Sequence, residues 1–121
     1  MQVQIFGVKG NADTRKALRY FSERRIKTHF VDLREKPPSR RELLRFTQKL
    51  GLEEVRDENS KKFADLGLRA AHLSDERWIE TMMAEPLVLK LPLVRRENQV
   101  AVGYKPHVWK TWLDEPRSPA V

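Results

Sequence analysis

The chain has 121 residues, the length of one ordinary domain, which is enough to bury a hydrophobic core without disulfides or metals. It contains no cysteine, and this excludes disulfides, thiolate nucleophiles and zinc–thiolate sites. The formal net charge of +7 favours either acidic partners or simple solubility, because the basic residues are interleaved with acids. No apolar stretch approaches the roughly 20 residues that cross a bilayer, and MQVQIFGVKG does not resemble a signal peptide. We therefore expect a cytoplasmic protein without membrane contact.

The first part of the chain has the pattern of a strand, a helix and a second strand. Residues 2–6 are predicted to form a strand, and the loop GVKGNAD then leads into a helix. Asn11 or Asp13 is a natural N-cap for this helix, which runs to about Glu23. Residues 27–33 are predicted to form the second strand. A unit of this length predicts two parallel strands joined by a right-handed crossover.

The middle of the chain, residues 36–85, carries helix signals and no strand signal. Ser39, with a glutamate three residues later, forms a capping box that starts a helix, and Gly51 is a natural end for it. Ser74 caps a later helix, which Pro86 ends. This segment is therefore predicted to be entirely helical.

The last part returns to strands. We predict strands over 87–95 and 98–103, joined by a tight turn, and a closing helix over 106–113. Trp109 and Trp112 lie on that helix, where packing against the sheet is favoured. A protein-binding patch that combines a tryptophan with the nearby Tyr104 and Lys105 stays open as an alternative.

The order of these elements predicts the fold class. A β-α-β unit, an all-helical block and a β-β-α unit make an α/β, thioredoxin-like fold with an all-helical insertion between its halves. We expect a single domain over residues 1–121. Its core is expected at residues 1–35 and 86–113, the insertion at 36–85 and a tail at 114–121.

Pro92 tests this fold, because a central strand rarely tolerates a residue that cannot donate to the ladder. A trans proline on an edge strand is one solution. Thioredoxin-like folds instead carry a cis proline beside the loop that holds their active site. We therefore expect the Leu91–Pro92 bond to be cis.

Four segments share, in the same order and with matching gaps over residues 2–113, the pattern of one known family. They are IFGVKGNADTRKAL, KKFADLGL, LSDERWIETMMAEPLVLKLPLV and QVAVGYKP. Together they resemble the arsenate reductase/Spx (ArsC/Spx) family of thioredoxin-like proteins. The VGY step is closer to the Spx-type regulators than to the reductases.

The resemblance implies a lost reaction. The family's nucleophilic cysteine stands at the start of the first helix, where alignment without gaps places Asn11, and an amide is no nucleophile. The reductases hold oxyanions with three arginines, of which Arg56 matches the first. Leu91 and Tyr104 stand at the other two positions. Thiol-dependent arsenate reductase activity is therefore not expected.

Several functions remain open. By resemblance, the chain is a non-catalytic regulatory or protein-interaction module whose basic surface binds an acidic protein. RNA polymerase is the partner that the likeness to Spx suggests, without direct reading of nucleic acid. The alternatives are a module that binds an anion or glutathione at the former active-site loop, and a residual oxidoreductase of the arsenate reductase or glutaredoxin type. The candidate ligand-binding residues are Lys9, Gly10, Asn11, Arg15, Arg56 and Pro92.

Two simpler expectations accompany these hypotheses. Asn11 is also among the best residues for capping a helix, so a purely structural role for it is favoured over anion binding. His29, His72 and His107 are scattered without the spacing of metal ligands, so we expect neither a metal nor a cofactor.

Overall fold

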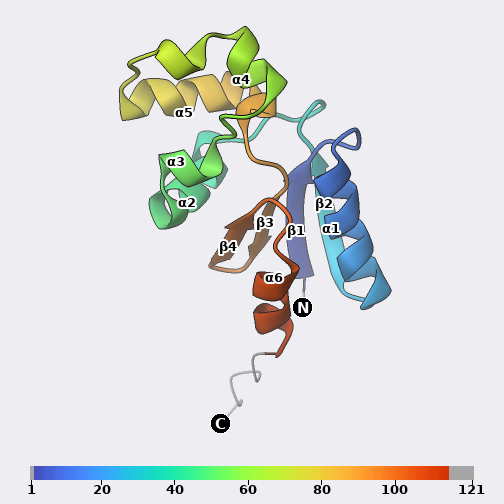
Figure 1. The fold of residues 1–121 in the computed structure, drawn as a ribbon. Helices are drawn as coiled ribbons and strands as arrows, with labels where there is room; N and C mark the ends of the chain where they lie inside the picture. The colour runs from blue at the N-terminus through green and yellow to red at the C-terminus, as the bar shows by residue number, and fades with distance from the viewer. Residues whose placement is uncertain (1, 115–121) are drawn as a thin grey trace.

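The computed structural model describes residues 2–114 and is built around one four-stranded sheet in the order β2-β1-β3-β4 (Figure 1). The strands are β1 (Gln2–Gly7), β2 (Lys27–Asp32), β3 (Leu93–Arg96) and β4 (Gln99–Val102). β1 and β2 run parallel and are joined through helix α1 (Ala12–Glu23), as predicted. β3 runs antiparallel to both β1 and β4.

The chain between β2 and β3 is helical. It forms α2 (Arg40–Leu50), α3 (Leu52–Val55), α4 (Lys61–Asp65), the 3-10 turn η1 (Leu68–Ala70), α5 (Asp75–Ala84) and the 3-10 turn η2 (Pro86–Val88). Helix α6 (Pro106–Asp114) follows β4. This order confirms the predicted thioredoxin-like fold with a helical insertion between its halves. No helix within residues 2–114 is long and apolar enough to cross a membrane.

Different helices cover the two faces of the sheet, with α1 on one side and the inserted helices on the other (Figure 1). Ile5 and Phe6 illustrate the division, because successive side chains of a strand point to opposite faces. Ile5 packs with Phe21 of α1 and Trp109 of α6. Phe6 packs with the insertion, and its ring meets that of Phe46 edge-on at 6.1 Å.

Side-chain caps start the longer helices. Asn11, Ser39 and Ser74 each accept a hydrogen bond from the backbone N–H three residues later, which satisfies one of the unpaired donors at a helix start. Gly51 ends α2 with a φ of 91°, a conformation that glycine adopts without strain. The predicted caps at both ends of α2 are therefore confirmed.

The strand predicted over 87–95 is wrong in its first half. Residues 86–88 form a 3-10 turn that begins at a proline, and the following backbone pairs with the insertion instead of the sheet. The N–H of Lys90 donates to the carbonyl of Val55 at 2.8 Å, and Leu89 forms a bridge with Arg56. The Leu91–Pro92 bond is cis, as predicted, and directly precedes β3. At this position the missing proline N–H breaks no bond of the ladder.

Both tryptophans of α6 are buried, with Trp109 fully enclosed and Trp112 4% exposed. Packing against the sheet is therefore confirmed for both, and neither indole contributes to a surface patch. Tyr104 behaves differently, because 42% of it is exposed. Its ring still meets Trp109 edge-on at 5.6 Å.

Candidate functional site

The β1–α1 loop, residues 8–11, is held tightly by its own side chains. Oδ1 of Asn11 accepts hydrogen bonds from the Thr14 N–H at 2.7 Å and from the Thr14 hydroxyl at 2.9 Å. Thr14 is fully buried and lies directly over Gly7, where an added Cβ would be only 2.4 Å from the Thr14 hydroxyl oxygen. Asn11 therefore acts as a cap that links the loop, the helix and the strand beneath them.

The outer side of this loop carries positive charge. Lys9 and Gly10 are exposed, and the Arg15 guanidinium donates to the carbonyl of Lys9 at 2.7 Å. Asp13 lies in the first turn of α1, 4.0 Å from the amine of Lys16. The helix start therefore offers cations and backbone N–H groups to an anion, but an acidic side chain stands beside them.

Arg56, the residue expected to match the first family arginine, contacts side chains of the insertion. Its guanidinium lies 4.4 Å from the ring centre of Trp78, and its Nε donates to Glu58 at 3.2 Å. Only 17% of the Arg56 side chain is exposed. Among residues 2–114, its side-chain contacts lie within the insertion and none is with the β1–α1 loop. The structure thus brings Lys9, Asn11 and Arg15 together and leaves Arg56 in a separate set of contacts.

The other positions named by the family pattern hold no charge. Leu91 is 7% exposed and belongs to the core on the insertion side of the sheet, next to the buried Pro92. Tyr104 presents an aromatic ring to the surface. Ala12, which follows Asn11, is the first residue of α1 and is exposed. A cysteine at either position 11 or position 12 would stand at the helix start.

The β1–α1 loop offers no thiol, because the chain has no cysteine. Within residues 2–114, no group of three or more His, Asp or Glu side chains is placed to hold a metal ion. The Thr14 hydroxyl donates to the Asn11 amide and has no base beside it that would activate it.

The charge of the molecule is divided in a way that sequence reasoning missed. Residues 9–27, the basic α1 segment, contain seven of the 24 Lys and Arg and two of the 17 Asp and Glu, a net charge of +5. Residues 51–85, the acidic insertion segment, contain five basic and nine acidic residues, a net charge of −4. Counting charge over stretches the length of one element would have found this, whereas interleaving at neighbouring positions hides it.

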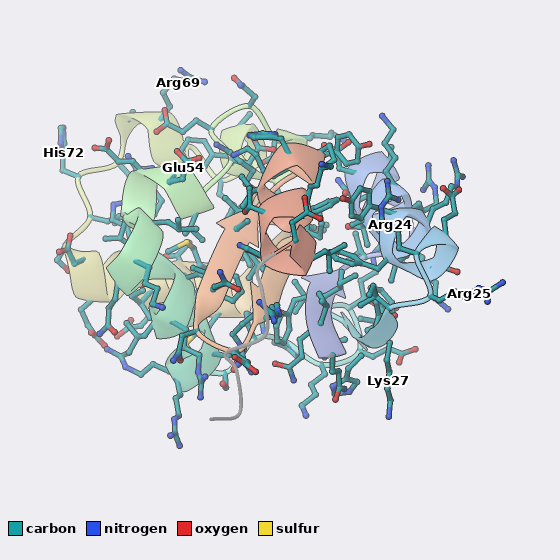
Figure 2. The ribbon with its side chains drawn as sticks, turned by 90° about the horizontal axis from the view of Figure 1, so that it is seen from below. Arg24, Arg25, Lys27, Glu54, Arg69 and His72 are labelled. Atoms are coloured by element: carbon teal, nitrogen blue, oxygen red, sulfur yellow. The ribbon has the colours of Figure 1, made fainter. Side chains whose placement is uncertain are left out.

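Figure 2 shows the two segments at opposite ends of the molecule. Arg24, Arg25 and Lys27 lie at the end formed by α1 and the start of β2, and all three are exposed. Glu54 and His72 lie toward the other end, over the insertion. The α1 end is therefore basic and the end over residues 51–85 is acidic, while the rest of the chain adds a net charge of +6.

Known proteins share this pattern of sequence and fold. The ArsC family model matches residues 6–112. The uncharacterized protein YusI of Bacillus subtilis is 28% identical over 95 residues, which cover 75% of this chain and 80% of that protein. The global transcriptional regulator Spx 2 of Oceanobacillus iheyensis is 28% identical in an alignment of 128 positions that covers 93% of each chain.

Solved structures agree on the fold. The YFFB protein superposes with a TM-score of 0.83 at 24% identity, covering 90% of this chain and 96% of its own. An arsenate reductase from Vibrio cholerae superposes with a TM-score of 0.78 at 24% identity, covering 89% of this chain and 94% of its own. At these identities the likeness concerns the arrangement of the backbone.

Proposed function

Because this chain belongs to the ArsC family, we propose that it is a non-catalytic member, a cytoplasmic protein-interaction module with a regulatory role. The observation that carries the proposal is the start of α1. The chain has no cysteine, and the amide of Asn11 is committed to two hydrogen bonds with Thr14. The scaffold is kept while the reacting group is absent, so binding is the function that the remaining surface supports.

A regulatory role is supported by the similarity to the global transcriptional regulator Spx 2 of Oceanobacillus iheyensis. RNA polymerase is accordingly the candidate partner. The excess of positive charge supports an acidic protein surface as the target, because complementary charge steers association and selects partners.

The loss of catalysis is tested by an arsenate reduction assay with glutathione and glutaredoxin. We expect no turnover from the wild-type chain. Ala12→Cys places a thiol at the helix start and leaves the Asn11 cap intact, and Asn11→Cys is the companion variant without the cap. We expect the thiol introduced by Ala12→Cys to react with iodoacetamide at a pH below the usual thiol pKa, because a helix start stabilises a thiolate. We expect no arsenate reduction by this variant, since positions 91 and 104 lack arginine. Turnover by the wild-type chain would refute the proposal.

The interaction role is tested by the binding of purified RNA polymerase to the immobilised protein. We expect saturable binding that weakens as salt is added, because exposed charges are screened. A family member that lacks basic residues on α1 serves as the reference. If polymerase does not bind at micromolar concentration, this partner is rejected.

Anion or glutathione binding at the β1–α1 loop is the second candidate, favoured by the exposed Lys9 and by Arg15, which is held 2.7 Å from the Lys9 carbonyl. Calorimetry with arsenate, phosphate and glutathione tests it. Heat at millimolar ligand that disappears in Arg15→Gln would support this candidate. The absence of heat would leave the loop with its capping role alone.

A further inference from the structure

A shallow hollow of about 290 Å³ lies on the outer side of α1, where this helix meets the start of α6. It is separate from the β1–α1 loop. Its wall contains the cations Lys16, Arg19 and Arg24, the rings of Tyr20 and Tyr104, and one acid, Glu23. Cations therefore outnumber acids around a surface that also offers aromatic carbon.

Two of these cations are held in place by the rings beside them. The Arg24 guanidinium lies 3.6 Å from the ring centre of Tyr20 and donates to the Tyr20 carbonyl at 3.0 Å. The Lys16 amine lies 5.5 Å from the ring centre of Tyr104. Because both cations are already positioned, less side-chain freedom is lost when a carboxylate binds them.

The cations of this side have few partners within the molecule. Among residues 2–114, Lys16 alone of the seven in the basic α1 segment is within ion-pair distance of an acid, Asp13 at 4.0 Å. In the acidic insertion segment, by contrast, five of the nine acids are ion-paired: Glu54, Glu58, Glu76, Glu80 and Glu85. A second copy of this chain would therefore offer an acidic side that is largely neutralised. The charge of α1 fits a different, acidic protein better.

We propose that the hollow between α1 and Tyr104 docks an acidic segment of a partner protein, an inference that rests on the proposed interaction function. Carboxylates of that segment lie on Lys16, Arg19 and Arg24, and an apolar side chain beside them packs on Tyr104. Tyr104 suits this role, because it is 42% exposed and lines the hollow together with the three cations. Aromatic side chains in such positions contribute much of the affinity at protein interfaces.

The same geometry disfavours nucleic acid as the occupant. Single-stranded nucleic acids bind when bases stack on free aromatic faces along a continuous basic track. Here Arg24 covers a face of the largely buried Tyr20 ring, so Tyr104 is the one exposed ring of the wall and a row of stacking rings is missing. Glu23 also interrupts the cations of the wall.

The test uses the full chain and a fluorescein-labelled peptide in which Glu and Asp alternate around one phenylalanine. We expect saturable binding in an anisotropy titration, and a loss of affinity of roughly tenfold or more in the double variant Lys16→Glu/Arg19→Glu. The matched control is Arg41→Glu/Lys61→Glu, which has the same net charge and alters exposed residues elsewhere. It should stay within about twofold of wild type, because screening limits charge effects at a distance.

Tyr104→Ala isolates the apolar part of the site. It should weaken the peptide several-fold and leave the salt dependence unchanged, because no charge is removed. Circular dichroism confirms for each variant that the fold is intact. Equal weakening by the control pair, or no binding of the peptide to the wild-type chain, would overturn the inference.

Four further outcomes identify a different occupant or separate this inference from the proposed function. An oligonucleotide of equal charge that binds more tightly, with the same loss in Lys16→Glu/Arg19→Glu, would replace the acidic protein by nucleic acid. Dimers in sedimentation that this variant abolishes would replace it by a second copy. If polymerase binds the wild-type chain and this variant equally, the site is wrong and the proposed function stands. If the peptide binds and polymerase does not, the partner is wrong and the site stands.

Discussion

The basic α1 segment and the acidic insertion segment lie at opposite ends of the molecule (Figure 2), and their charged side chains differ in how many form ion pairs. In the insertion most acids lie beside a cation of the same molecule, as in the pair of Glu54 with Lys105 at 3.7 Å. Among the cations of the α1 segment, in the part of the chain that the structure describes, only Lys16 lies within ion-pair distance of an acid, Asp13 at 4.0 Å. The difference shows that the net charge of +7 is a sum over one acidic segment and the basic segments around it, and not an even positive surface.

The two sides differ in packing as well. In the insertion, Trp78 stacks on Phe63 with the ring centres 6.0 Å apart, and Arg56 lies against its indole. Beneath α1, Trp109 is fully buried among Tyr20, Phe21 and Tyr104, and its indole N–H has no acceptor among residues 2–114. An unpaired buried donor lowers the free energy of unfolding, so the core beneath α1 contains a destabilising group beside its packed rings.

Removing these two tryptophans should give the largest effects. Trp109→Ala is expected to lower the free energy of unfolding by about 3–5 kcal/mol, the range for large buried aromatic side chains. Trp78→Ala should fall at the low end of that range, because 7% of Trp78 is exposed. Urea denaturation followed by far-ultraviolet circular dichroism measures both.

Trp109→Phe is the informative companion to this pair. It removes the unpaired indole N–H together with part of the ring, so the loss of packing is offset, and the net change should be within about 1 kcal/mol. A loss as large as that of Trp109→Ala would show that the N–H is not the weak point of this core.

The two helix caps come next. Asn11→Ala should cost about 2 kcal/mol, because it removes a cap and leaves the buried Thr14 hydroxyl without its acceptor. Ser74→Ala, at the start of α5, should cost about 1 kcal/mol, because its hydroxyl accepts one bond only, from the Arg77 N–H at 3.2 Å. Urea midpoints of the two variants, with Asn11→Asp as a cap-preserving control, test the order. If Asn11→Ala and Ser74→Ala lowered the free energy of unfolding equally, the Thr14 hydroxyl would have another hydrogen-bond acceptor when Asn11 is replaced.

A smaller effect of opposite sign is expected at the end of α1. Arg25 has a φ of 57°, and the N–H of Ile26 donates to Phe21 at 2.9 Å, the pattern of a left-handed helix end that glycine favours. Arg25→Gly should therefore raise the free energy of unfolding by about 0.5–1 kcal/mol. Thermal melts measure the change, and Arg25→Gln separates backbone relief from loss of charge. Destabilisation by glycine would contradict this reading of the backbone.

The smallest effect concerns the exposed pair of Arg40 on α2 and Glu76 on α5. The hydrogen bond from Arg40 lowers the pKa of the Glu76 carboxyl below its usual range. The stability that the pair contributes is therefore present above the unfolded-state pKa of Glu76 and is lost as the pH falls through the folded-state value. Arg40→Met should raise the pKa of Glu76, observed by NMR titration, and should change stability little because both groups are solvated. An unchanged pKa would show that the pair does not persist in solution.

Much of the fold was predictable because its signals are local. A cap at Asn11, a capping box from Ser39 and a glycine at position 51 each act within one helical turn, and all three mark real helix ends. The cis bond before Pro92 followed from combining a local conflict with the expected fold. The strand predicted over 87–95 began too early, because residues 89–90 pair with residues 55–56. This pairing depends on tertiary contacts, which the strand propensity of the segment does not reveal.

The surface was harder to predict than the core. The loop residues Lys9, Asn11 and Arg15 were found because a helix start draws attention to them, and the structure places them together. The hollow was missed, because it joins residues 16–24 to Tyr104, which lies far along the chain. Such a site depends on how α1 and the start of α6 pack, and no periodic pattern in either segment encodes that.

The strand order leaves β2 at one edge of the sheet, where its outer backbone groups face no other strand among residues 2–114. An open edge of this kind is a template on which another copy of the chain could add a strand and start an aggregate. Helix α1 packs beside this edge, so such an addition would bring two segments of charge +5 close together. Repulsion between them would oppose this addition at low ionic strength, and added salt would weaken the repulsion. The charge that we propose to bind an acidic partner would thereby also oppose self-assembly of the protein.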